Sequence, residues 1–373
     1  MKPKTACLRA PLIRRLTMRS LAFIAILAAL EMLGGALLGQ TPRVGALDED
    51  RIASHYGLDI WQTQQGLPSD AILTMIQTSD GYIWGGTFNG LVRFDGSFFH
   101  VFNKANTPAL LNNSIIALFE DSRRALWIGV QEGGVVRYKD GVFTRFDEGS
   151  GLGSLIARSF CEDADGALLI GTNKGLYRVN NVGVVTERLF NDLPLPDRVN
   201  ALRRDSAGTL WIGTDAGLIE TRGGNFFKRH KHAAGLPRHF VTSLYGSSSS
   251  LLDTLWIGTL NGLYILVGGE YQKFPLLDTA VAVRSLYRDR DGALWIGAEQ
   301  GLYVWRWMRG AFSLKRLGVE DGMSDNMVYS IAQDKEGSLW FGTYYGGFNR
   351  LKKQTFRNVG GKRRLFHDGN ARR

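Results

Sequence analysis

Cysteine is nearly absent from this chain, which has only Cys7 and Cys161 among 373 residues. Cys7 lies in an N-terminal segment with the features of an export signal, so Cys161 has no disulfide partner in the rest of the chain. This excludes the small secreted scaffolds that disulfides hold together. Cys161 lies in a predicted inner strand, where we expect a buried, small apolar side chain rather than a nucleophile or a metal ligand.

Recognisable catalytic motifs are also absent. The sequence contains no Gly-x-Ser-x-Gly, no His-Glu-x-x-His and no phosphate-binding loop. Its six histidines include His230 and His232, but no third ligand follows at a metal-binding spacing, so a solvated basic turn is the better interpretation. We therefore predict a protein that is not an enzyme and that has no metal and no cofactor.

Excess positive charge is missing from the central part of the sequence. The formal charge is +10, but residues 1–46 hold seven Lys/Arg and one acid, and residues 351–373 hold eight Lys/Arg and one acid. The 304 residues between them hold 30 basic and 33 acidic side chains. A folded domain that binds nucleic acid neutralises phosphates with a basic patch, so nucleic acid is not the expected partner.

Residues 1–46 have the order of a signal peptide. Basic side chains precede an apolar run from Leu21 to Leu30, and Val44-Gly45-Ala46 predicts cleavage before Leu47. The alternative is an uncleaved N-terminal membrane anchor, in which Glu31 interrupts the apolar stretch. Both interpretations place the rest of the chain outside the cytoplasm. It is periplasmic or secreted after cleavage, and anchored to the inner membrane without it.

One motif dominates the remaining sequence. Seven copies of Trp-Ile-Gly-Thr or a close variant recur at spacings of 43, 42, 42, 45, 39 and 45 residues. A glycine follows six positions after the first residue of every copy, from Gly90 to Gly346. The copies begin at Trp84, Trp127, Leu169, Trp211, Trp256, Trp295 and Trp340.

Each repeat predicts four short strands. In the fourth repeat, for example, the alternating run 199–203 leads through the turn 206–208 into the motif strand, and two more strands follow. Four strands every 40-odd residues are typical of a β-propeller blade. The sequence therefore predicts an all-β fold, a seven-bladed β-propeller of four-stranded antiparallel blades, over residues 47–359. A basic tail, residues 360–373, is expected to be disordered.

The motif residues have structural roles in this prediction. A side chain at the motif glycine would block the close packing of neighbouring blades, and the second glycine suits a turn with positive φ. The motif tryptophans are expected to bury flat surfaces between blades rather than to form a ligand cage. These residues are Trp84, Trp127, Trp211, Trp256, Trp295 and Trp340, with Gly86, Gly129, Gly171, Gly213, Gly258, Gly297 and Gly342.

The sequence does not decide which end of the chain supplies the strand that closes the ring. A propeller usually completes one blade from both ends of the chain. Residues 54–61 and residues 355–359 are both suitable as the outer strand of the seventh blade. An unpaired terminal edge would favour association with other chains.

The motifs carry a family resemblance. Residues 61–70, followed by Asp80-Gly81-Tyr82-Ile83-Trp84-Gly85-Gly86-Thr87, resemble the two-component regulator propeller repeat, and its leading phrase recurs at 235–239 and 321–326. The likeness covers about residues 55–351. Leu169 replaces tryptophan in the third blade, and Ser247–Ser250 replace the hairpin of the fifth, so these two blades are expected to pack less well.

The resemblance implies a function. In that family the propeller is the extracytoplasmic sensor of hybrid histidine kinases or diguanylate cyclases, which continue into a membrane helix and catalytic modules. No such module follows Arg350, so we interpret the chain as a truncated sensor histidine kinase in a phosphorelay. A free-standing propeller is the alternative.

A ligand is expected on one face of the ring. In a four-stranded blade, the loop before the first strand and the loop between the second and third strands lie at the same end. Aromatic side chains beside amides and acids suit a glycan, a peptide or another small extracellular ligand, whereas solvated turns are the simpler interpretation of any single residue. The candidates are Phe88, Asn89, Gln131, Glu132, Asn173, Lys174, Asp215, Arg238, His239, Asn261, Glu299, Gln300, Asn326, Tyr344 and Tyr345.

Three functions therefore stay open. The first is a sensor that passes its signal to a kinase or cyclase output module in cis or in trans. The second is a secreted propeller enzyme, a polysaccharide lyase or glycosidase, against which the missing acid/base residues count. The third is a scaffold that binds protein partners.

Overall fold

The computed structural model describes ten segments of the chain, residues 56–153, 156–180, 185–189, 198–222, 226–230, 240–247, 254–267, 270–274, 281–308 and 311–353. The predicted signal segment, the basic tail and the alternative closing strand at 355–359 lie outside these segments. Within them, no helix is long and apolar enough to cross a membrane.

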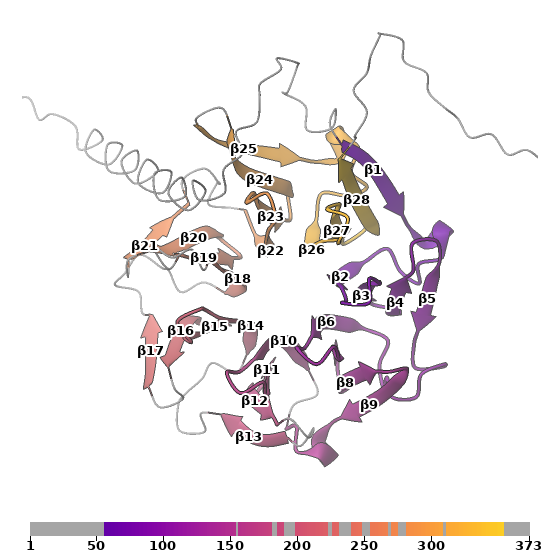
Figure 1. Cartoon of the computed structure of the whole chain (residues 1–373), viewed down its shortest axis with the longest axis vertical. Helices are drawn as coiled ribbons and strands as arrows, with labels where there is room; N and C mark the ends of the chain where they lie inside the picture. Colours follow the sequence, from indigo (N-terminus) through magenta and orange to yellow (C-terminus); the bar gives the residue numbers. More distant parts are fainter. Residues whose placement is uncertain are drawn as a thin grey trace, which may run out of the picture.

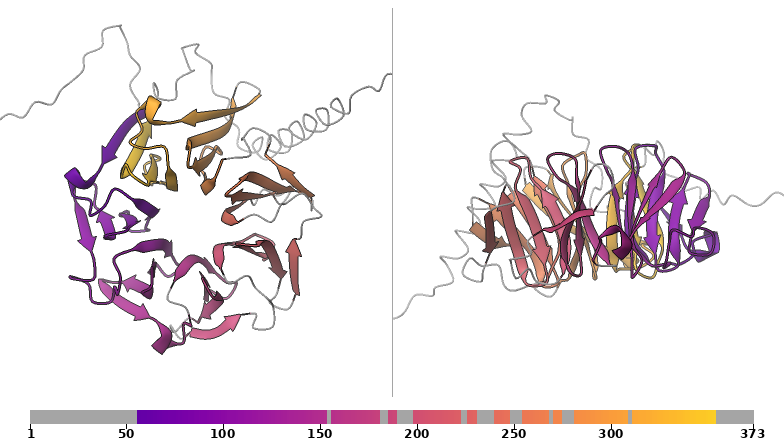
Figure 2. Two further views of the ribbon diagram at one scale, coloured as in Figure 1. Left: turned by 180° about the vertical axis from the view of Figure 1, so that it is seen from behind. Right: turned by 90° about the horizontal axis from the view of Figure 1, so that it is seen from below.

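Seven four-stranded antiparallel sheets stand around a central axis, which confirms the predicted propeller (Figure 1). In blades one to six the strands follow one another outward from the axis in chain order. From the side, the sheets stand upright next to each other as blades of similar height (Figure 2).

The strands of the first four blades are β2 (Ile72–Gln77), β3 (Ile83–Thr87), β4 (Gly90–Phe94) and β5 (Phe99–Phe102); β6 (Ile115–Glu120), β7 (Leu126–Val130), β8 (Gly134–Lys139) and β9 (Val142–Phe146); β10 (Ala157–Glu162), β11 (Leu168–Thr172), β12 (Gly175–Val179) and β13 (Val185–Leu189); and β14 (Val199–Arg204), β15 (Leu210–Thr214), β16 (Gly217–Arg222) and β17 (Phe226–His230). Those of the last three are β18 (Val241–Ser247), β19 (Thr254–Thr259), β20 (Gly262–Val267) and β21 (Glu270–Lys273); β22 (Val283–Arg288), β23 (Leu294–Ala298), β24 (Gly301–Met308) and β25 (Ala311–Leu317); and β26 (Val328–Gln333), β27 (Leu339–Thr343), β28 (Phe348–Lys353) and β1 (Tyr56–Trp61). The described residues also form the short 3₁₀ turns η2 (Thr63–Gln65), η3 (Glu148–Ser150) and η5 (Val319–Asp321).

The N-terminal segment closes the ring. Strand β1 pairs antiparallel with β28, from Tyr56 opposite Lys353 to Trp61 opposite Phe348. The Trp61 ring stacks on Trp340 with centroids 5.1 Å apart, and the Arg350 guanidinium lies over both rings. The seventh blade is thus built from both ends of the described chain, so β28 is paired along its outer side.

The motif glycines lie where two blades touch, as predicted. A Cβ added at Gly213 would come within 2.5 Å of Val241 in the next blade, and one at Gly342 within 2.4 Å of Ile72. Val241 and Ile72 each begin the innermost strand of the following blade. Because real Cβ atoms do not approach other atoms so closely, only glycine lets the inner strands pack at this distance.

The prediction that the second glycine of the motif has a positive φ is wrong in two blades. In blade one, Gly90 has a φ of 150°, as expected for the turn after the motif strand. In blades two and seven the left-handed position is taken one residue later, by Gly134 and Gly347, each with a φ of 77°. Their loops contain one more residue than the loop of blade one, so the chain turns back one position further on.

The motif tryptophans have a partner that the sequence analysis missed. An aspartate six positions earlier accepts a hydrogen bond from the indole N–H in four blades, for example Asp205 from Trp211 at 2.9 Å and Asp334 from Trp340 at 2.7 Å. In blade one the Thr78 hydroxyl takes this place at 3.0 Å. Since a buried indole N–H needs an acceptor, this spacing explains how tryptophan fits between blades.

Blade three shows what happens without the tryptophan. Leu169 is buried, and Asp163, six positions earlier, pairs instead with Arg204 at 2.7 Å and with Arg178 at 3.5 Å. Leu169 packs with Leu176, Val199, Ile212 and Ile219 between blades three and four. The looser packing expected at Leu169 stays a prediction. The hairpin of the fifth blade lies outside the described segments.

Candidate ligand-binding site at the channel mouth

The loops expected to share a face do share one. In five blades the first residue after the motif strand donates its backbone N–H to the carbonyl just before the innermost strand, as Glu299 does to Ala282 at 3.1 Å. The motif threonine holds the same loop, because the Thr87 hydroxyl donates to the Gly90 carbonyl at 2.9 Å. The end of each innermost strand and the loop after the motif strand are therefore joined.

Every innermost strand has a bulge next to this face. The pairing register shifts after the first residue of the strand in all seven blades, as between Ile72 and Thr74. Such a bulge leaves one residue out of the ladder and redirects its side chain. The bulged residues are Leu73, Ile116, Arg158, Asn200, Thr242, Arg284 and Tyr329. Together with the loop residues that they touch, we call them the channel mouth.

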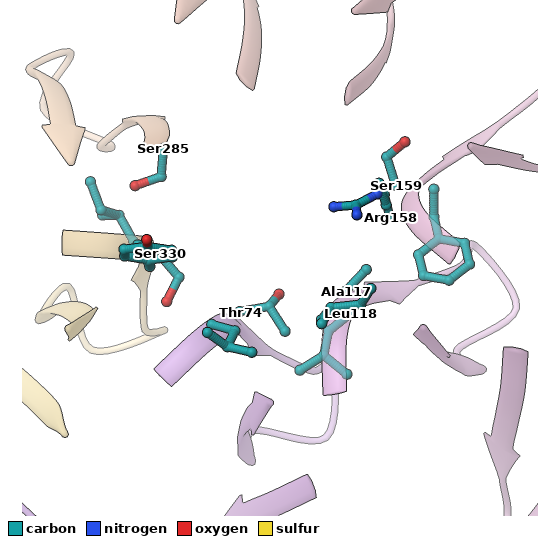
Figure 3. Close-up of a pocket in the computed structure, with 12 residues that line it drawn as sticks. Thr74, Ala117, Leu118, Arg158, Ser159, Ser285 and Ser330 are labelled. Carbon is teal, nitrogen blue, oxygen red and sulfur yellow. The ribbon is translucent and has the colours of Figure 1, made fainter. Parts of the chain in front are cut away.

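A cavity of about 220 Å³ lies between the innermost strands. Bulged residues from four blades line it, namely Leu73, Ile116, Arg158 and Tyr329, and Ser159, Ser285 and Ser330 complete the wall. Figure 3 shows these side chains arranged around an open centre, with the Arg158 guanidinium pointing inward from β10.

The polar side of the mouth consists of bulged residues hydrogen-bonded to loop residues. Arg284 donates to the Glu299 carboxylate through both Nε, at 3.1 Å, and Nη2. Asn200 donates to Asp215 at 2.8 Å. In blade three, Arg158 Nε donates to the side-chain oxygen of Asn173.

Charge is unevenly distributed on this side. Glu299 balances Arg284, and Arg198 lies 3.6 Å from Asp215. Arg158 has only the neutral Asn173 as a hydrogen-bond partner among the described residues. Burial lowers the pKa of Arg158, and the positive charge of Arg198 lowers it further while Asp215 raises it. The guanidinium still remains charged at neutral pH, because arginine titrates far above 7.

The opposite side of the mouth is apolar and aromatic. Tyr329 packs against Tyr344 with ring centroids 5.0 Å apart, and Tyr344 in turn makes edge contacts with Phe88 at 5.8 Å and Tyr345 at 4.7 Å. Burial raises the pKa of Tyr329, so this phenol stays neutral. Leu73 and Ile116 continue the apolar side toward blade two. The mouth is thus amphipathic across its width.

The structure separates the predicted face residues into two groups. Asn173, Asp215, Glu299 and Tyr344 contact bulged residues and belong to the mouth. Phe88 and Tyr345 extend its aromatic side, with 38% and 67% of their surfaces exposed.

Other candidates support the loops. Asn89 donates to the Pro68 carbonyl at 3.0 Å, Gln131 accepts from Ser114 at 2.9 Å, and Asn326 accepts from the Val319 N–H at 2.9 Å. Asn261 donates its backbone N–H to the Thr259 hydroxyl at 3.1 Å. For Glu132, Lys174 and Gln300, no contact with a bulged residue is seen among the described side chains. Arg238 and His239 lie outside the described residues.

Sequence reasoning overlooked the bulged residues, although a signal was present. In six of the seven repeats, all but the fifth, the bulged residue stands eleven positions before the first residue of the motif. Arginine, asparagine and tyrosine at these positions differ from the small and β-branched residues around them. A comparison of the repeats at that position would have found them.

Two other predictions concern chemistry. Cys161 lies in β10 and is partly buried; burial raises the pKa of its thiol, which disfavours a reactive thiolate. In the segments that the structure describes, no three His, Cys, Asp or Glu side chains gather as metal ligands do.

The repeats match a known family. The profile of the two-component regulator propeller matches residues 66–89, 194–216, 278–300 and 322–345, in blades one, four, six and seven. These four of the seven repeats are similar to the two-component regulator propeller repeat. Each matched segment runs to the loop after the motif strand, so a regulator propeller repeat includes the bulge and the loop that form the channel mouth. The search of curated proteins found no significant match.

Solved structures show the same fold. An extracellular domain assigned to a hybrid two-component system of B. thetaiotaomicron is 21% identical, with a TM-score of 0.69 over 79% of this chain and 42% of that one. A second such domain from the same organism is 21% identical, with a TM-score of 0.65 over 81% and 40%. Virginiamycin B lyase from Staphylococcus aureus is 12% identical, with a TM-score of 0.59 over 80% and 99%. At these identities the likeness shows the propeller fold alone, and the chain spans about two fifths of the two sensor domains.

Proposed function

We propose that this propeller is the extracytoplasmic ligand-sensing region of a two-component, phosphorelay sensor histidine kinase. The regulator propeller repeats and the fold shared with extracellular domains of hybrid two-component systems support this proposal. The observation that carries it is the channel mouth, where side chains from most blades converge on one cavity.

A regular frame that places different residues around one opening is suited to recognition. The loops and bulges vary from blade to blade, so a ligand at the mouth meets a cation, an amide, apolar side chains and aromatic rings in fixed positions. Signalling then requires that the ligand favour one arrangement of the receptor over another, since equal affinity for both shifts nothing. The output module, a kinase or cyclase in cis or in trans, would read that change.

Ligand binding is tested by screening the purified chain against extracellular glycans, peptides and small organic molecules with a thermal-shift assay, followed by calorimetry. Replacing Tyr344 with alanine removes the ring that joins Tyr329, Phe88 and Tyr345, so we expect at least tenfold weaker binding of a ligand at the mouth. Phe98→Ala is the matched control. Phe98 is 72% exposed in the β4–β5 turn, at the other end of the blade, and its loss should leave affinity unchanged.

The receptor part of the proposal is tested by sequencing the locus through and beyond codon 373 in all frames. Further regulator propeller repeats, a membrane helix and a kinase or cyclase encoded there would support the receptor. A clean stop, with no such reading frame nearby, would count against the receptor and favour a secreted binding protein.

A lyase is the second candidate, because this chain aligns with 99% of the length of two streptogramin lyase structures. A catalytically inactive histidine-to-alanine variant of one of them was solved with quinupristin. In this chain the two histidines within the described residues, His100 and His230, lie on the outermost strands β5 and β17, away from the cavity. Turnover of a streptogramin or a polysaccharide by the purified chain would favour the enzyme over the sensor.

A further inference from the structure

Arg158 is the starting point, because its charge is not balanced as that of the neighbouring arginines is. Arg284 shares its charge with Glu299, and Arg198 is 3.6 Å from Asp215. Arg158 is half-buried, points into the cavity and makes its hydrogen bond to an amide. Asp215 attracts it only through space, and Arg198 repels it. A partly buried cation without a hydrogen-bonded anion is costly, and an oxyanion in the cavity would offset that cost.

Arginine favours a carboxylate as that anion. A guanidinium fork binds a planar carboxylate through two parallel hydrogen bonds. The hydroxyl groups of Ser159, Ser285 and Ser330 do not take part, because they are buried against the motif glycines of their own blades.

A single negative charge fits better than two. Asp215 and Glu299 lie at the same mouth and repel additional negative charge, while Arg158 is the one arginine of the mouth that lacks a carboxylate partner among the described residues. A phosphate dianion would therefore be held less well than a carboxylate.

The other side of the cavity determines what the carboxylate is attached to. Leu73, Ile116 and Tyr329, from blades one, two and seven, offer apolar surface in the same cavity. A sugar ring would place hydroxyl groups against Leu73 and Ile116, where they would lose hydrogen bonds to water without replacement. An aromatic or branched aliphatic body would bury its surface there instead. At about 220 Å³, the cavity is smaller than typical sites for drug-sized ligands, so the ligand is small.

We propose that the channel mouth binds a small organic carboxylate with an apolar body, with its acid group at Arg158 and its body against Leu73, Ile116 and Tyr329. This inference rests on the proposed ligand-binding function and specifies the class of ligand.

The test compares acids with their neutral amides by isothermal titration calorimetry on the purified chain. The probes are phenylacetate and isovalerate, with phenylacetamide and isovaleramide as neutral counterparts and inorganic phosphate and galacturonate as the other anions. We expect at least one of the two acids to bind tenfold or more tightly than its amide and than the other anions. Equal affinity for acid and amide, or no binding of either acid, would overturn the proposal, and this arm needs no variant.

The second arm removes the cation. Arg158→Gln should reduce the affinity for the acid at least tenfold, to that of the amide, and leave the amide unaffected. Lys174→Gln is the matched control, because Lys174 is an exposed cation on the loop next to Asn173 and outside the cavity lining; it should change affinity less than twofold. Circular dichroism and thermal unfolding confirm that both variants are folded. Unchanged binding of the acid by folded Arg158→Gln would contradict the proposal.

The two levels of inference can be told apart. If the acids fail while a neutral glycan or peptide binds and Tyr344→Ala weakens it, the mouth is a ligand site for another class and only the present inference falls. If nothing in the wider screen binds at the mouth, both fall.

Discussion

The contacts between blades and the channel mouth differ in how their residues repeat. Between blades, the same contacts recur around the ring. They involve the motif glycine, the residue that begins the next innermost strand, and the tryptophan with its hydrogen-bond acceptor, which together we call the interblade frame. At the mouth, no two neighbouring blades supply the same bulged residue. We therefore expect the frame to determine stability and the variable residues of the mouth to determine which ligand is bound.

The largest expected difference lies within blade seven. Trp340 belongs to the frame and is 2% exposed, whereas Tyr345 belongs to the mouth and is 67% exposed. Trp340→Ala should lower the free energy of unfolding by about 3–5 kcal/mol, and Tyr345→Ala should change it by less than about 0.5 kcal/mol. Urea unfolding at equilibrium measures both. Similar losses in the two variants would contradict the division.

Two glycines of blade five compare a tightly packed frame position with a position that has space for a side chain. A Cβ at Gly258 would lie 2.2 Å from the Ser243 hydroxyl and 2.8 Å from Val283, whereas one at Gly246 would meet nothing closer than 3.7 Å. Gly258→Ala should cost about 1–3 kcal/mol through overpacking. Gly246→Ala should stabilise the chain by about 0.4–1 kcal/mol because it restricts the unfolded state. Opposite signs in chemical unfolding are the expected result, and equal losses would count against the packing argument.

Blades three and four together test the role of the aspartate six positions before the motif. In blade four Asp205 accepts from Trp211, whereas in blade three Asp163 pairs with two partly exposed arginines. Asp205→Asn should cost about 1 kcal/mol at any salt concentration, since the charged acceptor of an indole is lost. Asp163→Asn should cost less than about 1 kcal/mol, and the loss should shrink in 1 M salt. Unfolding curves at low and high salt separate the two, and a salt-independent loss in Asp163→Asn would contradict the ion-pair role.

The smallest effect concerns the outer edge of blade four. Burial lowers the pKa of His230 below its ordinary 6.5, although Glu220 at 3.1 Å opposes this; Lys228 lowers it further, and the Tyr271 ring packs against the imidazole. Because the unfolded chain binds the proton more readily, stability should fall as the pH drops below about 6.5 toward the folded pKa. His230→Gln should reduce the slope of unfolding free energy against pH between 7 and 5. A variant with the wild-type slope would disprove this contribution.

Much of the interblade frame could be predicted from the sequence. The glycine contacts followed from the period, because a residue that repeats every 39–45 positions must meet the same neighbour in each blade. The aspartate six positions before the motif recurs in five of the seven repeats but was overlooked. The positive φ of Gly134 and Gly347 was misplaced by one residue, because the length of a loop decides where the chain turns.

The mouth could be predicted only in part. Tyr344, Asn173, Asp215 and Glu299 were found from loop positions, since strand order alone fixes which loops share a face. Their partners were missed, because alternation along a strand assigns each residue to one side of a sheet and a bulge breaks that alternation.

The sequence by itself determined the number of blades, their four strands and the residues that pack between them, because these depend on contacts repeated between adjacent units. Only the tertiary structure decided that β1 closes the ring and that Arg158 and Tyr329 face one cavity. These features depend on the ring as a whole, since closure brings together residues far apart in the chain that no local pattern connects.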